Sequence, residues 1–347
     1  MINGAFMMAT GVLSIPAGLL ADRFGARILA VSGILAASLS SFLVTMCTTP
    51  GQMASAYLLF GVGLAAFIPS MLSQVPSTFP AERLGQAYGW YSTAMYVAIT
   101  LGPATGGYLG KTIGLRPVFY ISGAILFLVA LVAFVCLPRS SGSRRQEPRA
   151  LLVASCSLLR NRTLGACLLV TWGTAMGFGI FLSFLPLYAT GKGLDPAQVG
   201  LVFAGQALTN VFGRIPVGLA VDRFDRRYIV AAGMLFFAVG LSSLGLFRHT
   251  LTLSVCAVLL GIGMALCFTA VGALIAESVS PVQRGLAMGM YNSSVYLAMM
   301  SGSTIFGACV ETTGYPAGFA FGGGAALVSL AAFLRVMDAD HRVQRER

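Results

Sequence analysis

The segment GLLADRFGAR, Gly18 to Arg27, occurs again 200 residues later as GLAVDRFDRR, Gly218 to Arg227. In both copies an Asp-Arg pair directly follows a run of apolar residues. Between positions 15 and 27, eight of thirteen residues are identical at this offset, whereas unrelated apolar segments would agree at about one position. The same register continues at Gly61, Gly63, Gly89, Tyr96, Ala98, Gly102 and Gly107, which recur as Gly261, Gly263, Gly289, Tyr296, Ala298, Gly302 and Gly307. The chain therefore contains an internal duplication, and the parallel repeat predicts two matching helix bundles with both loops on one membrane face.

The composition places these repeats in a membrane. Of 347 residues, 57% are apolar and 10% are charged, whereas a soluble domain has about 25% charged residues. Windows of about 20 apolar residues are long enough to cross the hydrocarbon core of a bilayer. The sequence has eleven of them, at 2–21, 28–47, 53–76, 85–110, 115–137, 164–189, 197–221, 228–247, 251–276, 285–310 and 317–336. The predicted fold class is an all-α polytopic membrane protein.

Four regions follow from this pattern. We expect an amino-terminal bundle over 1–137, a linker over 138–162, a carboxy-terminal bundle over 163–337 and a tail over 338–347. The linker is rich in Ser, Arg and Pro, and we expect a short amphipathic helix near 151–159 to lie along the membrane surface.

The charge distribution predicts the orientation. Of the 22 Lys and Arg residues, eighteen lie on the side of the two Asp-Arg loops, and only Lys111, Arg116, Lys192 and Arg248 lie opposite. By the positive-inside rule, the loops, the linker and the tail are predicted to be cytoplasmic. The net charge of +11 is thus explained by topology, and we expect no nucleic-acid partner. The cysteines show no metal-binding spacing, so no metal and no cofactor are expected.

At these residues the chain resembles the major facilitator superfamily, whose signature loop has the form Gly-x-Leu-x-Asp-Arg-x-Gly-Arg. In that resemblance the loop latches the two bundles against the helix that begins near Arg284 and Gly285, and its glycine adopts a positive φ for the turn. A plain charged turn that only sets topology is the alternative. The first copy departs from the pattern at Ala26 and the second at Asp225, which replaces the turn glycine. The implied latch residues are Gly18, Asp22, Arg23, Gly25, Arg27, Gly218, Asp222, Arg223 and Arg227.

The resemblance also changes the helix count. In the family this loop follows the second helix, but here it follows the first predicted window, which leaves five helices in the first half and six in the second. We therefore expect Met1 to be a start inside the family's usual reading frame, with a misassigned start codon favoured over a true eleven-helix carrier.

The segment 89–107, GWYSTAMYVAITLGPATGG, resembles the antiporter signature of the same family. The matching positions are Gly89, Ala98, Gly102, Pro103, Gly106 and Gly107, with Ala98 in place of a glycine. We expect Pro103 to kink the helix and the glycines, including a GxxxG pair, to pack against a helix of the other half. The resemblance implies efflux in exchange for an ion. The alternative is a helix-packing kink that says nothing about the direction of transport. Tyr57 stands where such antiporters commonly have an arginine, and no acidic residue lies at mid-membrane depth, so proton coupling stays open.

The remaining candidates are polar residues within predicted helices. Arg214 is the charge deepest in a window, and we expect it to pair with Glu277. Gln206, Asn210 and Arg214 follow a spacing of four residues and share one helix face. The candidate cavity residues are Tyr96, Trp172, Gln206, Asn210, Asn292 and Tyr296. Without a central fixed charge, they favour an uncharged or amphiphilic cargo.

The sequence thus predicts a secondary transporter that exports a small organic compound by alternating access, with protons as the coupling ion. We expect a monomer in the cell inner membrane. Uptake of a sugar or an organic acid is one alternative, and a non-transporting membrane sensor or inactive fragment is another. An enzyme is not expected, because the chain shows no nucleophile, base and acid set and no phosphate-binding loop.

Overall fold

The structure is a computed structural model, and it describes residues 2–80, 83–138, 158 and 160–345. Within the helices, some side chains lie outside this description, among them those of Asp22, Tyr96 and Pro103. The amphipathic helix expected near 151–159 lies almost wholly outside the described residues.

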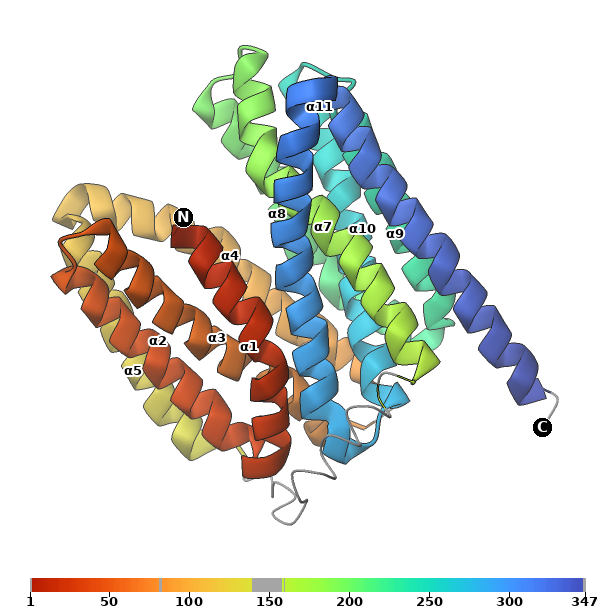
Figure 1. Cartoon of the computed structure of the whole chain (residues 1–347), viewed down its shortest axis with the longest axis horizontal. Helices are drawn as coiled ribbons and strands as arrows, with labels where there is room; N and C mark the ends of the chain where they lie inside the picture. Colours follow the sequence, from red (N-terminus) through yellow and green to blue (C-terminus); the bar gives the residue numbers. More distant parts are fainter. Residues whose placement is uncertain (1, 81–82, 139–157, 159, 346–347) are drawn as a thin grey trace. The chain divides into compact units, whose positions relative to one another are not determined.

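All regular elements in the described part are helical (Figure 1). The α-helices are α1 (Ile2–Phe24), α2 (Ala26–Met46), α3 (Pro50–Thr78), α4 (Leu84–Ile113), α5 (Leu115–Cys136), α7 (Arg162–Gly191), α8 (Pro196–Arg223), α9 (Arg226–Leu244), α10 (Thr250–Ser278) and α11 (Arg284–Arg345), with a 3-10 turn at Pro281–Gln283. Gly314 interrupts α11 with φ 78° and ψ 170°, so this element holds two helical segments. The described helices therefore account for all eleven predicted windows, and the predicted all-α class is confirmed.

Seven of the described helical segments are long and apolar enough to cross a membrane. They are Ala26–Met46, Pro50–Val75, Leu115–Cys136, Arg162–Gly191, Arg226–Leu244, Thr250–Ser278 and Thr312–Met337. The other predicted windows lie in α1, α4, α8 and the first segment of α11. In α8 the polar side chains of Gln206, Asn210 and Arg214 lower the mean hydropathy. The same residues are candidate functional groups.

By their contacts, the described residues form two compact units. Unit 1 comprises Met1–Thr78, Leu101–Arg160 and Val279–Leu297, and unit 2 comprises Phe79–Thr100, Asn161–Ser278 and Ala298–Arg347. The predicted division into 1–137 and 163–337 follows the repeats. The contact units differ from the repeats at two places. The first part of α4 groups with unit 2, and the first part of α11 groups with unit 1.

In unit 1, α2 packs against both α3 and α5, and α1 packs against α3 (Figure 1). Glycines allow the closest approach: a Cβ atom on Gly63 would lie 2.6 Å from the carbonyl oxygen of Gly33. At the contact with α5, the Ser38 hydroxyl donates to the carbonyl oxygen of Gly123 at 2.8 Å. Close backbone approach and a buried side-chain hydrogen bond are the means by which membrane helices associate.

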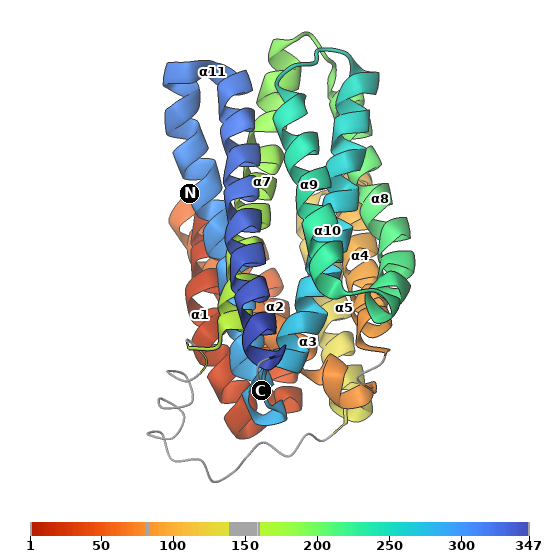
Figure 2. The ribbon, with the colours of Figure 1, turned by 90° about the vertical axis from the view of Figure 1, so that its right-hand side faces the viewer.

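Unit 2 repeats this packing with α10 against α8 and α9 (Figure 2). A Cβ atom on Gly263 would lie 2.6 Å from the carbonyl oxygen of Gly233, the positions 200 residues after Gly63 and Gly33. The duplication read from the sequence is thus present as the same backbone contact in both units.

The Gly33–Gly63 contact predicts a stability difference. Replacing Gly63 by Ala places a methyl group against the opposing backbone, and overpacking of this kind costs about 1–3 kcal/mol. We expect the Gly63→Ala variant to unfold about 2–10 °C below the wild type, measured by thermal size-exclusion chromatography in detergent.

Gly51→Ala is the matched control, because a Cβ atom there would meet nothing within 4 Å. Ala is also the better helix former, so its melting temperature should stay at or above that of the wild type. Equal melting temperatures for the two variants would contradict the role of the glycine contact.

Candidate functional site

The first Asp-Arg loop reverses the chain between α1 and α2. Gly25 is the N-cap of α2 with φ 93°, the positive value expected for this turn. Arg27 then donates from Nη2 to the carbonyl oxygen of Phe134, and its guanidinium lies 4.9 Å from the centroid of the Phe134 ring. Arg23 is exposed, 5.2 Å from the centroid of the Phe24 ring. The loop thus anchors the start of α2 to the end of α5.

Gly18 lies against the start of α11 within unit 1. A Cβ atom on Gly18 would clash with the backbone of Gly285 and lie 3.0 Å from the Cα atom of Leu286. The side chain of Asp22 lies outside the described residues. The structure therefore brings the first motif against the segment named by the resemblance, through backbone contact at Gly18.

The second loop makes the corresponding contact through a charge. The Asp222 carboxylate oxygen Oδ2 accepts a hydrogen bond from the backbone N–H of Gln86 at 2.9 Å. Gln86 lies in the first turn of α4, which begins at Leu84. The first N–H groups of a helix have no partner within it, and the helix dipole favours an anion there. Asp222 thus caps the amino end of α4.

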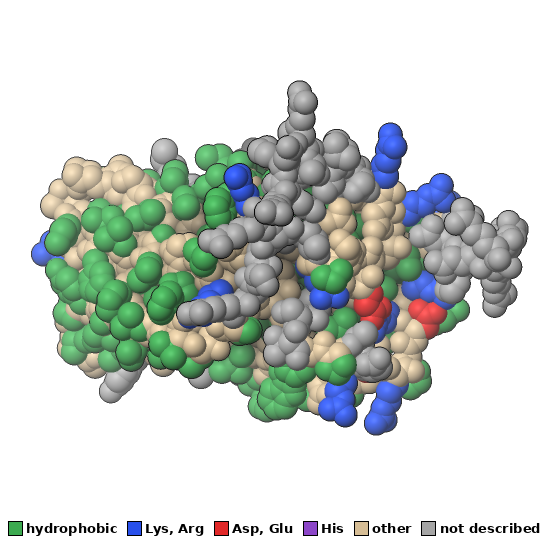
Figure 3. All heavy atoms as spheres, turned by 90° about the horizontal axis from the view of Figure 1, so that it is seen from below, with side chains coloured by type: hydrophobic (Ala, Val, Ile, Leu, Met, Phe, Trp, Pro, Cys, Tyr) green, Lys and Arg blue, Asp and Glu red, His purple; other side chains and the backbone are tan. Residues whose placement is uncertain are grey.

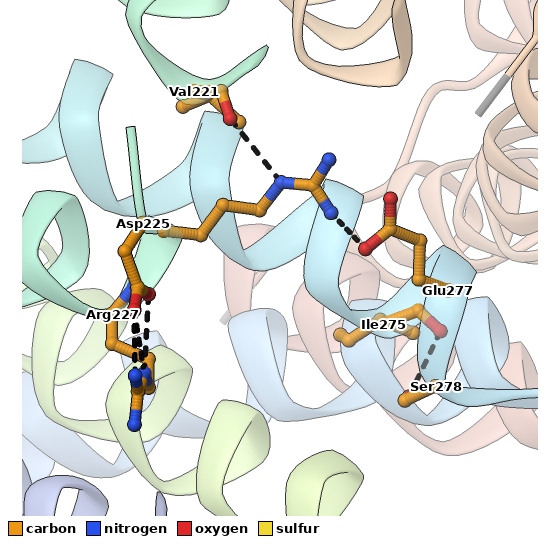
Figure 4. Close-up of polar contacts among 7 residues, drawn as sticks. Val221, Asp225, Arg227, Ile275, Glu277 and Ser278 are labelled. Atoms are coloured by element: carbon orange, nitrogen blue, oxygen red, sulfur yellow. Dashed lines mark hydrogen bonds and ion pairs between the residues drawn. The ribbon is translucent and has the colours of Figure 1, made fainter. Parts of the chain in front are cut away.

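Asp225, which replaces the turn glycine of the first copy, has a different task. Its φ is −61°, and its side chain caps α9 by accepting from the backbone N–H of Arg227 at 3.0 Å. It also forms an ion pair with the Arg227 guanidinium at 2.6 Å (Figure 4). The second turn therefore needs no positive φ, because an N-cap carboxylate begins the next helix.

Glu277 does not form the pair expected with Arg214. Its carboxylate instead pairs with Arg226 Nη1 (Figure 4). The reason is depth along the helices: Glu277 is the last residue but one of α10, whereas Arg214 lies nine residues before the end of α8, or about 13 Å at the rise of an α-helix. Figure 3 shows Asp and Glu side chains lying close to Lys and Arg side chains on one face.

Two further contacts join the repeats at equivalent positions, one in each unit. In unit 2, a Cβ atom on Gly89 would lie 2.7 Å from the carbonyl oxygen of Arg214 and 3.5 Å from the Cα atom of Gly218. In unit 1, a Cβ atom on Gly289 would clash with the carbonyl oxygen of Ser14 and lie 3.3 Å from the Cα atom of Gly18. Each glycine of the pair 89 and 289 thus holds a helix of one repeat against a helix of the other.

Hydrogen bonds reinforce these contacts one turn further along. Thr93 Oγ1 donates to the carbonyl oxygen of Val211 at 3.5 Å. At the positions 200 residues away, the Ser293 hydroxyl donates to the carbonyl oxygen of Gly11. The crossing of α4 with α8 therefore has the same design as the crossing of α11 with α1.

The second part of the antiporter-type segment lies in unit 1, whereas the part of α4 up to Thr100 groups with α8 in unit 2. A Cβ atom on Gly102 or Gly106 would meet nothing within 4 Å. The expected packing of this GxxxG pair against a helix of the other half stays a prediction. Ala98 is exposed, whereas the side chain of Pro103 and the surroundings of Gly107 lie outside the described residues.

The polar face of α8 is buried against α10. Gln206, Asn210 and Arg214 are 5%, 0% and 1% exposed. Arg214 Nη2 donates to the Asn210 side-chain oxygen at 3.2 Å, and Asn210 Nδ2 donates to the carbonyl oxygen of Gln206 at 3.2 Å. The Gln206 amide contacts the Met264 sulfur at 3.4 Å, and the Arg214 guanidinium lies 6.0 Å from the centroid of the Phe268 ring. These groups form a continuous polar row within an apolar core.

The other cavity candidates are divided between the units. In unit 1, Asn292 Nδ2 donates to the Ser14 hydroxyl at 2.6 Å, and the Tyr296 ring meets the Phe6 ring edge-on at 5.8 Å. In unit 2, Trp172 is 40% exposed on α7. The side chain of Tyr96 lies outside the described residues. A common cavity for all six residues therefore stays a prediction.

Sequence reasoning missed Ser14, Ser293 and the Gln86 amide. Ser14 and Ser293 could have been found from the offset, because Arg214 and Thr93 stand at the equivalent positions. The Gln86 contact uses a backbone N–H, which any residue supplies, so only the start of a helix after residue 83 could have indicated it.

Comparisons with known proteins agree with this architecture. The sequence model of the family described as Major Facilitator Superfamily matches residues 1–195 and 167–347 of this chain. An uncharacterized MFS-type transporter of Methanocaldococcus jannaschii is 24% identical over 321 residues, 90% of this chain and 82% of that protein. The multidrug resistance protein MdtG of Proteus mirabilis is 27% identical over 276 residues, 77% of this chain and 68% of MdtG.

A solved structure shows the same fold. The human organic anion transporter MFSD10 (TETRAN) superposes with a TM-score of 0.81 at 19% identity, covering 96% of this chain and 82% of that one. With the family model matched along the whole sequence, the chain belongs to the major facilitator superfamily and is a multi-pass membrane transporter of small molecules, not an enzyme.

Proposed function

We propose that this transporter exports a small organic compound by alternating access, in exchange for protons. Two lines of similarity support export: the MdtG relative is a multidrug resistance protein, and the segment 89–107 resembles the antiporter signature. Alternating access is supported by the contact of Asp222 with the amino end of α4, which we take as one latch of the transport cycle.

The Asp222 contact has a strength that suits a reversible latch. A carboxylate at a helix amino terminus contributes about 0.3–1 kcal/mol when exposed and up to about 2 kcal/mol when partly buried. Because Asp222 is half-buried, the contact holds one state without trapping the protein in it. By the distribution of Lys and Arg, we propose that both Asp-Arg loops face the cytoplasm.

The fixed charge of Arg214 limits its part in coupling. Arginine keeps its proton in proteins, so Arg214 does not itself carry the coupling proton. Among the described residues, the placed carboxylates of Asp195, Asp222, Asp225 and Glu277 all lie at helix ends. We propose that Arg214 instead holds the polar row of α8 in place while the cargo, uncharged or amphiphilic, is moved.

Transport itself is tested with purified protein in proteoliposomes carrying an imposed pH gradient. Ethidium and a panel of uncharged and amphiphilic antibiotics serve as cargo, and the readouts are dye movement and cargo-dependent collapse of the gradient. Accumulation into inside-out vesicles supports export, whereas accumulation into right-side-out vesicles supports uptake of a metabolite. A well-folded protein that moves nothing in the panel and dissipates no gradient would favour the sensor alternative.

Neutralising the latch carboxylates should slow transport. In Asp222→Asn, the amide oxygen can still accept a hydrogen bond but the negative charge at the end of α4 is lost. We expect the transport rate to fall about three- to thirtyfold, with normal insertion judged by expression and melting temperature. Asp22→Asn is expected to have the same effect.

Asp195→Asn is the control for loss of a carboxylate on the same helix. Asp195 caps the amino end of α8 through Gln198, and Asn is as good an N-cap as Asp. This variant should transport at the wild-type rate. Wild-type flux in both Asp222→Asn and Asp22→Asn would refute the latch.

A second prediction concerns the polar row of α8. Asn210→Leu removes the side-chain oxygen that accepts from Arg214 and should destabilise the protein by about 1–3 kcal/mol. Combining it with Arg214→Leu should cost less than the sum of the single changes, because the two residues act as a pair. Unfolding in denaturant measures all three variants. Thr209→Val is the control, since among the described residues that hydroxyl bonds only to the carbonyl oxygen of Gly205 in its own helix. Additive effects of Asn210→Leu and Arg214→Leu would refute the pairing.

A further inference from the structure

Unit 1 contains a cavity of about 130 Å³ whose lining includes none of the candidate latch, antiporter-motif, cavity or charge-pair residues. It does include Tyr57, which stands where antiporters of the family commonly have an arginine. Its walls come from three helices: Ser40 and Ser41 from α2, Tyr57 and Phe60 from α3, and Phe119 and Ser122 from α5. The α2 residues lie in the last two turns of that helix, so the cavity lies at the end of unit 1 opposite the Gly25 turn.

The walls of this cavity are fixed by hydrogen bonds between helices. The Ser40 hydroxyl donates to the carbonyl oxygen of Ala56 at 2.6 Å and ties α2 to α3. Two residues before, on the other side of α2, the Ser38 hydroxyl ties this helix to Gly123 of α5. A cavity whose walls are already held together does not have to be ordered by its ligand, which favours binding.

Two polar groups of the lining are left for a ligand. The hydroxyls of Tyr57 and Ser122 make no hydrogen bond to any described residue, whereas Ser40 and Ser41 donate to backbone carbonyls. The remaining side chains of the lining are apolar: Phe60 and Phe119 are aromatic, and Val44 is aliphatic. None of the lining side chains is charged.

The repeat shows that these hydroxyls are not a packing requirement of the fold. At the positions 200 residues after Ser41, Tyr57 and Ser122 stand Leu241, Ala257 and Gly322. Leu241 and Ala257 are fully buried, and a Cβ atom on Gly322 would lie 3.0 Å from Cδ1 of Ile180 and 2.9 Å from Leu241 Cδ2. At these three positions unit 2 therefore has buried apolar residues, and only unit 1 has hydroxyls.

From this geometry we propose that the cavity between α2, α3 and α5 binds an uncharged aromatic ring that carries a hydroxyl group. An engineered apolar cavity of about 150 Å³ binds benzene, so the volume suits a single ring of this size. Phe60 and Phe119 offer aromatic contact, and the Tyr57 and Ser122 hydroxyls can donate to or accept from the hydroxyl of the ligand. A charged ring is disfavoured because nothing in the lining offsets the cost of removing its charge from water.

Phenol is the probe, with benzene, benzoate and benzylammonium as comparisons. Binding to the full chain in lipid nanodiscs is measured by saturation-transfer-difference NMR titration. Ser41→Leu introduces the side chain found at the equivalent position of unit 2 and should fill the cavity. The difference between wild type and Ser41→Leu removes the contribution of phenol that simply dissolves in lipid.

We expect saturable phenol binding in the wild type, none in Ser41→Leu, and weaker binding of benzene, benzoate and benzylammonium. Tyr57→Phe and Ser122→Ala should each weaken phenol binding about three- to tenfold. Tyr120→Phe and Ser55→Ala are the matched controls, because Tyr120 lies on α5 and Ser55 on α3, both outside the lining. These two variants should bind phenol with the affinity of the wild type.

Four results would overturn the proposal. Equal signals in wild type and Ser41→Leu would mean that phenol only partitions into lipid. Equal affinity for phenol and benzene, or unchanged phenol affinity in both Tyr57→Phe and Ser122→Ala, would mean that the hydroxyls take no part. Binding in detergent that disappears in nanodiscs would mean that a lipid acyl chain occupies the cavity.

Discussion

Contact between helix backbones at glycine is the constraint on which this structure depends. In a bilayer there is no hydrophobic gain in bringing apolar helices together, so association relies on close packing and on buried hydrogen bonds. Gly33 with Gly63 and Gly233 with Gly263 provide such contacts inside each unit. Gly89 and Gly289 provide them between helices of different repeats.

On this shared backbone frame, the two copies have diverged in their side chains. Ser14 and Arg214 occupy equivalent positions, yet the first accepts from Asn292 and the second extends a polar row toward α10. The loops diverge in the same way, because Gly25 turns the chain by a positive φ and Asp225 does so as an N-cap. Backbone contacts at glycine tolerate such changes, since they leave the facing side chains free to differ.

The sequence predicted what depends on local pattern. Eleven apolar windows, the duplication and the turn at Gly25 follow from hydropathy, register and the steric freedom of glycine, and the structure contains all of them. The predicted pairing of Glu277 with Arg214 was wrong, because Glu277 pairs with Arg226 instead. Pairing by charge alone ignored the difference in depth between the end of α10 and the middle of α8. Packing of Gly102 and Gly106 against the other half stays a prediction, because sequence does not show which part of α4 lies against another helix. The cavity of unit 1 could not be predicted at all, since it depends on side-chain volumes from three helices.

The bond from the Gln86 N–H to the Asp222 carboxylate differs in kind from the ion pairs of the same loop. Nearby in the sequence, Arg226 forms an ion pair with Glu277 and Arg227 forms one with Asp225. An ion pair with a flexible arginine can follow its partner as helices move, whereas a backbone N–H at the start of α4 has a fixed direction. The bond to Gln86 therefore reports the position of α4 itself and is lost when that helix shifts by a few ångströms, since a hydrogen bond weakens steeply with distance and angle. A contact of this kind is sensitive to geometry in a way that the surrounding ion pairs are not.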